Sequence, residues 1–153
     1  MKFNNLKEVT KYFEELNQDN YYLDYILAEG TTSLEWYKAI LKTVKKYKPK
    51  RVIDVGSSVN MFGYLFANEG IQYIGVDIDR TLNPIITDKI FFINDNYYNV
   101  RERFKDDIII SCLCVGYLIP IKDVLGKILI VNELDYINNN SVCVAKEIQL
   151  KKR

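Results

Sequence analysis

The sequence contains no histidine among its 153 residues. Histidine is the commonest general base in enzymes and a frequent zinc ligand, so its absence excludes histidine-dependent hydrolases, proteases and zinc deaminases. Only three cysteines are present, and no two of them form a C-x-x-C pair. This spacing favours reduced core thiols over a disulfide framework or a structural zinc site, and we predict no metal site.

A strong net charge and long apolar runs are also lacking. The 21 basic and 20 acidic side chains nearly cancel, so no overall field would attract a nucleic acid or an anionic membrane. Lysines are concentrated in residues 42–51, which we interpret as a solvated helix end, because cations are stable near helix C-termini. A nucleic-acid partner is therefore left open but is not indicated.

The N-terminal residues MKFNNLKEVTKYFEEL mix charged with apolar side chains. They fit neither a secretory signal nor a membrane span. We predict a cytoplasmic protein with no membrane partner.

The residues that are present fit one globular domain. A hydrophobic content of 48% in a chain of this length is enough to bury a core. We predict a single domain over residues 1–153, with helices in residues 1–49 and a sheet core in residues 50–153.

Three helices are expected before the sheet core. Leu6, Val9 and Phe13 recur at helical spacing, and a second short helix is predicted in YYLDYILAEG. In TTSLEWYKAILKTVKKYKPK, a third helix is predicted to be capped by Thr32 and to end before Pro49.

Short apolar runs rich in β-branched residues alternate with turns or helical segments in the rest of the chain: RVIDVG, IQYIGVDI, KIFFIND, DDIIISCLCV and KILIVNELDYI. Several of these runs are apolar at successive positions, which is typical of parallel strands covered on both faces. The last run, SVCVAKEIQL, alternates and follows NNN, so it is predicted to be an antiparallel edge strand. We expect a three-layer α/β sandwich with five or six strands and an N-terminal helical cap. RTLNPIITD is too short for a full crossover helix.

The end of the first strand is the expected ligand site. Gly56 follows this strand, and ligands of open parallel sheets bind outside the carboxyl ends of the strands. Asn60 is predicted to cap the next helix, whose Phe62 and Phe66 would face the sheet, and Gly70 would end it.

An acid follows the second strand. Asp77 lies 23 positions after Asp54, close to the offset of about 20 at which a carboxylate binds ribose hydroxyls. Ser58 and Met61 stand where the NAD and FAD fingerprint requires glycines, and no G-K-[ST] phosphate loop is present. These observations favour a nucleoside ligand without a pyrophosphate.

VIDVGSS followed by YIGVDID resembles the first two motifs of class I S-adenosylmethionine-dependent methyltransferases, and the resemblance covers about residues 50–137. It implies a Rossmann-like fold, S-adenosylmethionine as cofactor, and methyl transfer to an unidentified small molecule, protein or RNA. It also implies a set of cofactor contacts: Asp54, Gly56, Ser57 and Ser58 at the methionine end, Asp77 at the ribose, Ile78, Asn94 and Asp95 around the adenine, and Ser111 and Cys112 after the fourth strand.

Two departures from the family pattern motivate an alternative. Ser58 replaces the family's second glycine, and only about 16 residues follow the fifth strand, where the family has a further helix and two strands. The alternative is a catalytically inactive relative that acts as a binding or regulatory partner. A different nucleoside ligand also stays open, as does a homodimer or protein complex through the edge strand.

No catalytic residue is assigned from the sequence. Tyr97, Tyr98 and Tyr117 are candidate substrate contacts, with packing as the equal alternative. Cys112 and Cys114 are expected to lie on one face of the fourth strand as packing residues.

Overall fold

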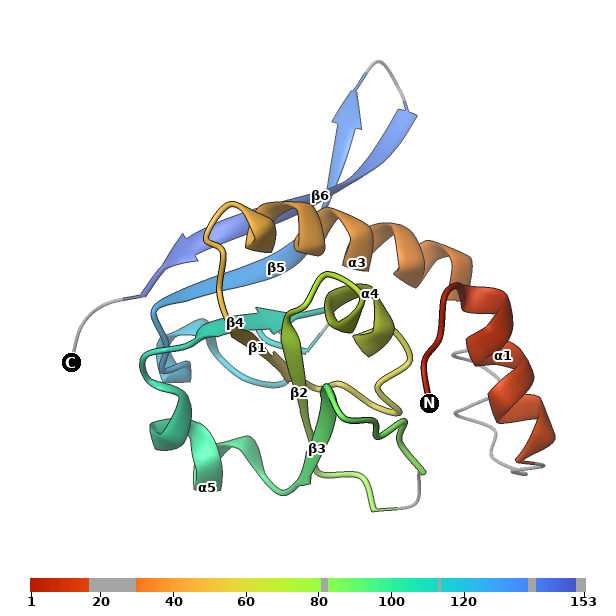
Figure 1. The fold of residues 1–153 in the computed structure, drawn as a ribbon. Coiled ribbons are helices and arrows are strands. Elements are labelled where there is room, and N and C mark those ends of the chain that lie inside the picture. The colour runs from red at the N-terminus through yellow and green to blue at the C-terminus, as the bar shows by residue number, and fades with distance from the viewer. Residues whose placement is uncertain (17–29, 81–82, 113, 138–139, 151–153) are drawn as a thin grey trace.

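The computed structural model of the chain describes residues 1–16, 30–80, 83–112, 114–137 and 140–150, which are built around a six-stranded sheet (Figure 1). The strands are β1 (Arg51–Val55), β2 (Gln72–Asp77), β3 (Ile90–Asn94), β4 (Ile108–Ser111), β5 (Ile128–Ile137) and β6 (Asn140–Gln149). Their order is β3-β2-β1-β4-β5-β6, and only β6 is antiparallel to its neighbour. The predicted mostly parallel sheet with an antiparallel C-terminal edge is confirmed.

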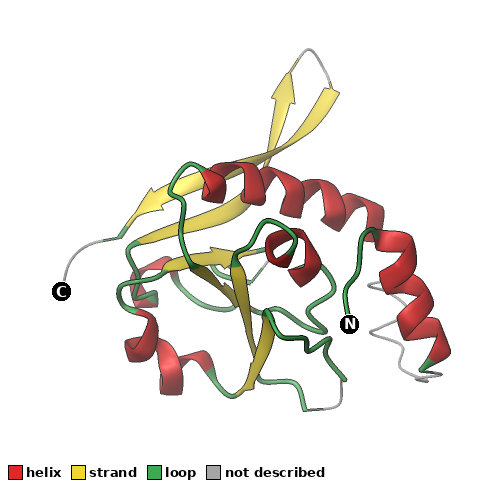
Figure 2. Ribbon diagram, viewed as in Figure 1, coloured by secondary structure: helices red, strands yellow, loops and turns green. Residues whose placement is uncertain are grey.

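The helices of the described residues are α1 (Leu6–Glu15), α3 (Gly30–Lys45), α4 (Gly63–Ala67) and α5 (Tyr97–Val100), with 3-10 turns η1 (Arg101–Phe104) and η2 (Ile121–Asp123) (Figure 2). None of them is long and apolar enough to cross a membrane. α1 begins where the side chain of Asn5 accepts the Glu8 N–H, and it buries Val9 and Phe13 as predicted. The helix predicted in YYLDYILAEG lies almost wholly outside the described residues.

The predicted start of α3 is wrong. The helix already includes Gly30, so Thr32 lies within it and lacks the extended backbone that a capping residue needs. Its inner face is as expected, since Tyr37 and Val44 are buried. α3 ends at Lys45, before Pro49.

Two core clusters lie on opposite faces of the sheet because successive side chains of a strand alternate between faces. On one face, α1, α3 and α4 pack against strand residues such as Val52 and Ile130. On the other face, α5, η1 and the segments after β4 pack against residues such as Ile53 and Leu129. The parallel strands are therefore covered on both faces, which confirms the three-layer arrangement. No helix occurs among the described residues between β2 and β3, also as expected.

The hairpin of β5 and β6 extends beyond the rest of the sheet. β4 pairs with β5 only from Ile128 to Val131, whereas β6 pairs with β5 as far as Ile137. The outer part of the hairpin therefore projects as a two-stranded ribbon (Figure 1).

Candidate functional site

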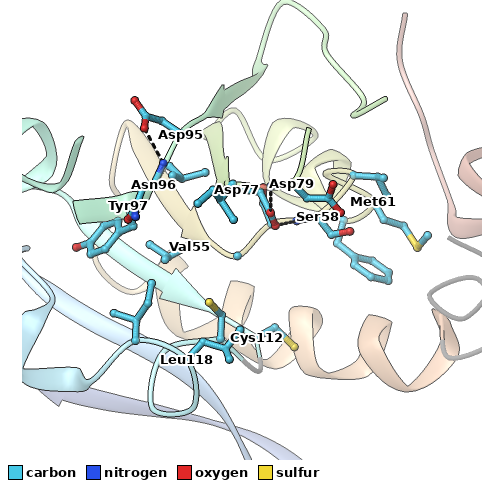
Figure 3. Close-up of a pocket in the computed structure, with 18 of the residues that line it drawn as sticks. Val55, Ser58, Met61, Asp77, Asp79, Asp95, Asn96, Tyr97, Cys112 and Leu118 are labelled. Atoms are coloured by element: carbon cyan, nitrogen blue, oxygen red, sulfur yellow. Dashed lines mark hydrogen bonds between the residues drawn. The ribbon is translucent and has the colours of Figure 1, made fainter. Parts of the chain in front are cut away.

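A cavity of about 630 Å³ lies at the carboxyl ends of β1 and β2. This volume is within the range of small-molecule sites. Its wall also includes residues of α3, the start of α5 and the segment after β4 (Figure 3). Seven of the ten predicted site residues line it: Gly56, Ser57, Ser58, Asp77, Ile78, Asp95 and Cys112. The other three, Asp54, Asn94 and Ser111, do not line it.

The floor of the cavity is the turn after β1, whose backbone is left-handed at Gly56, Ser58 and Asn60 (φ 80°, 52° and 58°). The positive φ of Gly56 favours glycine at this position, and the lack of space around it does so as well. A Cβ atom there would lie 2.5 Å from Cβ and 2.7 Å from Sγ of Cys114, which are impossible contacts. The close neighbour of Gly56 in this structure is therefore the segment after β4.

Asp77 joins two turns at the edge of the cavity. One carboxylate oxygen accepts the N–H of Ser58 at 2.8 Å, and the other accepts the N–H of Asp79 at 2.9 Å (Figure 3). A carboxylate has about four acceptor positions, so both oxygens keep the capacity to accept a further hydrogen bond. Asp77 can therefore hold the turn and bind a ligand hydroxyl at the same time.

Asn60 is not the helix cap that the sequence predicts. Its buried side chain donates to the carbonyls of Ile85 and Phe91 at 3.1 and 3.2 Å, and α4 begins at Gly63 without a side-chain cap. Phe62 occupies the capping position of α4, and Asn60 lies two residues before it. Asn60 instead connects the turn to β3 and to the segment before it.

Gly75, in the middle of β2, makes room for this turn and was missed by the sequence reasoning. A Cβ atom at Gly75 would overlap Oδ1 of Asn60 and Oγ of Ser57. The available signal was a glycine inside a strand, which often marks a close backbone approach.

Asp54 is buried on the α3 side of the sheet, outside the cavity wall. One carboxyl oxygen accepts the hydroxyls of Tyr37, at 2.7 Å, and Tyr73. The other oxygen has no hydrogen-bond partner in the described part of the chain. Burial raises the pKa of Asp54 to about 7, although the two tyrosine hydrogen bonds act in the opposite direction. The Asp54 carboxyl is connected to the cavity wall by its hydrogen bond from Tyr37, which lines the cavity.

Asn94 and Ser111 position turns instead of lining the cavity. The Asn94 amide donates to the carbonyls of Asp77 and Asp79 at 2.9 and 3.0 Å. The Ser111 hydroxyl donates to the Val55 carbonyl at 3.1 Å and accepts the Val115 N–H at 2.9 Å. These contacts fix the ends of β2 and β4 relative to the cavity.

Asp95 stands on the cavity wall just before α5. Its carboxylate accepts the side-chain amide of Asn99 at 2.9 Å and the N–H of Asn96 at 2.7 Å, and these donors lower the pKa of Asp95. Tyr97 and Tyr98 follow it and also line the cavity.

The three tyrosines proposed as substrate contacts have different surroundings. The Tyr97 ring is buried, whereas the Tyr98 hydroxyl donates to Asp123 at 2.7 Å, which raises the pKa of Tyr98. Tyr117 is 74% exposed and is not part of the cavity wall.

Cys112 and Cys114 do not share a strand face, because β4 ends at Ser111. Cys112 packs against the core cluster on the α3 side, and Cys114 packs against the opposite cluster. Burial raises the pKa of both thiols, to about 11 for Cys114 and further for Cys112. Both are protonated at neutral pH and are unsuited to act as thiolate nucleophiles.

The sequence reasoning missed the wall that α3 provides. Trp36 and Tyr37 line the cavity from this helix, and the Tyr37 ring stacks on Phe62 with centroids 4.8 Å apart. Leu118, in the segment after β4, was also missed. Adjacent aromatic residues on an amphipathic helix were the signal, since they cannot both face the core of the sheet.

The charged side chains of the wall are all acidic. Asp77, Asp79 and Asp95 line the cavity, and none of its described wall residues is lysine or arginine. Residues 42–51 hold many of the basic side chains. They lead into the amino end of β1, whereas the cavity lies at the carboxyl end of that strand. The cavity therefore suits a neutral or cationic ligand better than a polyphosphate.

Neither a family model nor a curated protein sequence significantly matches this chain. The chemistry of the site therefore has to be inferred from the geometry itself.

Proposed function

We propose that this chain is an S-adenosylmethionine-dependent methyltransferase and that the cavity binds this cofactor. The observation that carries the proposal is the position of the cavity, where the turn after β1 meets Asp77 at the end of β2. This is where open parallel sheets bind nucleoside ligands. The acidic wall supports a cofactor whose sulfur carries a positive charge.

Each part of the cofactor has a corresponding part of the wall. The turn of Gly56 to Ser58 would hold the methionine part, and Asp77 would accept the ribose hydroxyls. Ile78 and Asp95 would flank the adenine. When bound, the cofactor supplies an electrophilic methyl group on a sulfonium sulfur.

The residues of this chain would act mainly by alignment. Methyl transfer is an in-line displacement, in which proximity and orientation supply much of the rate, so a histidine base is not required. Trp36, Tyr37 and Phe62 form an aromatic wall that would exclude water from the reacting atoms.

Calorimetric titration with S-adenosylmethionine and S-adenosylhomocysteine tests the proposal. We expect saturable binding at micromolar strength, weakened at least about tenfold by Ile78→Ala, since Ile78 lines the cavity and is 64% exposed. Ile86→Ala is the matched control, because Ile86 is 56% exposed and outside the wall. Absence of binding to the folded protein, or equal loss in both variants, would refute the cofactor site.

A catalytically inactive relative is the second candidate. A hydrogen bond made by the turn after β1 favours it. The Ser58 N–H already donates to Asp77, so this donor of the turn is not available to a ligand. Ser58→Gly separates the two functions. If S-adenosylmethionine binds the variant but not the original protein, the Ser58 side chain obstructs the site and the inactive relative is favoured.

We also propose that the protein is cytoplasmic, as the sequence predicts. The free state of Cys112, Cys114 and Cys143 supports it, because disulfides are rare in that compartment.

A further inference from the structure

The side of the cavity that faces α3 differs in character from the side that holds the carboxylates. Figure 3 shows Cys112 and Leu118 across the cavity from Asp77 and Asp95. Together with Trp36 of α3, these two residues form an uncharged part of the wall. The two sides would therefore select different chemical groups.

Leu118 is held in an exposed position by an ordered turn. Its N–H donates to the Cys114 carbonyl at 2.9 Å, and the Gly116 N–H donates to the Ile119 carbonyl at 2.7 Å. The side chain is nevertheless 82% exposed and stands at the cavity wall. A ligand that covers this side chain would remove apolar surface from water, which is favourable.

The inner part of this side is aromatic. Trp36 and Tyr37 come from α3, and Phe62 stacks on Tyr37. An uncharged apolar body would fill this space, whereas an anion would lose its hydration and gain no cation from the described wall. Two arginines lie beside wall residues without lining the cavity. The Arg101 guanidinium stacks on Tyr98 and donates to the Asp123 carbonyl, and Arg80 helps to lower the pKa of Asp95.

We propose that the methyl acceptor is a small, uncharged, largely apolar molecule that binds between α3 and Leu118. This inference rests on the proposed methyltransferase function. It disfavours RNA, because the basic residues 42–51 lead into the amino end of β1, whereas the cavity lies at the carboxyl end of that strand.

Two probes with the same phenyl ring and nearly the same size test the inference: 2-phenylethanol, which is uncharged, and phenylacetate, which is an anion. Each is titrated calorimetrically into the protein, with and without saturating S-adenosylhomocysteine. Trp36 is the sole tryptophan, so its fluorescence reports whether a probe reaches the α3 wall. We expect 2-phenylethanol to bind at least about tenfold more tightly than phenylacetate and to change this fluorescence.

A charge placed at the mouth gives the matched comparison. Leu118→Asp should weaken 2-phenylethanol binding at least about tenfold. Ile121→Asp should leave it unchanged, because Ile121 is 41% exposed and lies outside the wall. Tighter binding of phenylacetate or of a short single-stranded RNA, no binding of 2-phenylethanol, or equal effects of the two variants would overturn the inference.

Failure of the cofactor site would be seen separately, in the S-adenosylhomocysteine titration. The probe titration without that ligand would still test the apolar side of the cavity.

Discussion

The two ends of β1 hold their acidic side chains in different ways. At the amino end, the Asp107 carboxylate binds Arg51 through two hydrogen bonds of 2.8 and 2.7 Å, and the guanidinium lies over Phe104. Near the carboxyl end, Asp54 is buried with two tyrosine hydroxyls and no cation.

The two ends of β1 therefore differ in what their polar side chains contribute. At the amino end, a charge pair joins two segments at a partly exposed site, where such pairs contribute little. The carboxyl end contains the left-handed turn and a buried carboxyl, features that cluster at functional sites. The cavity lies at this second end.

The largest expected effect is the pH dependence caused by Asp54. Its pKa rises from 3.8 in the reference state to about 7 in the folded protein, so folding binds a proton between these values. The free energy of unfolding should therefore fall by roughly 4 kcal/mol as the pH rises through this window, and this contribution should be constant above it. Asp54→Asn should remove that slope, measured by urea unfolding at a series of pH values. An unchanged slope in the variant would contradict the assignment.

A smaller effect is expected from two glycines with similar backbone. Gly56 and Gly70 have φ values of 80° and 76°, but a Cβ atom meets Cys114 at the first and open space at the second. Gly56→Ala should cost about 3 kcal/mol, combining backbone strain and overpacking. Gly70→Ala should cost about 1 kcal/mol, from strain alone. Denaturant unfolding measures both, and equal losses would show that Cys114 contributes nothing to the need for Gly56.

The smallest effect should come from the amino end. Arg51→Met breaks the pair with Asp107 and should cost about 1 kcal/mol or less, because the Arg51 side chain is 39% exposed. Titration with S-adenosylmethionine should give the same affinity as the original protein. A changed affinity would mean that the two ends are not independent.

The strands could be predicted from the sequence because their apolar runs are long and separated by clear turns. All six runs became strands, whereas their order in the sheet is known only from the structure. The alternation of apolar and polar residues in SVCVAKEIQL correctly predicted an antiparallel edge strand.

The side chains around the cavity were harder to predict. Asp54 shares the face of Val52, so its carboxyl enters the α3 side of the sheet, and strand alternation could have indicated this. Asparagine is a residue type that often caps helices, but Asn60 has a left-handed backbone and its side chain binds the carbonyls of Ile85 and Phe91. Adjacent aromatic residues on α3 indicated that one of them lies outside the core, but that it lines this cavity depends on how the helix packs on the sheet.

The projecting β5 and β6 hairpin has a consequence for how the chain folds. Its pairs are local, since Ile137 faces Asn140, and such hairpins form within microseconds. The hydrogen bond from Ser111 to Val55, at the base of the cavity, joins residues 56 positions apart. Pairing of that range carries a larger loop-closure cost and slows folding. The hairpin can therefore nucleate early, and the cavity is completed only when the distant parallel strands come together.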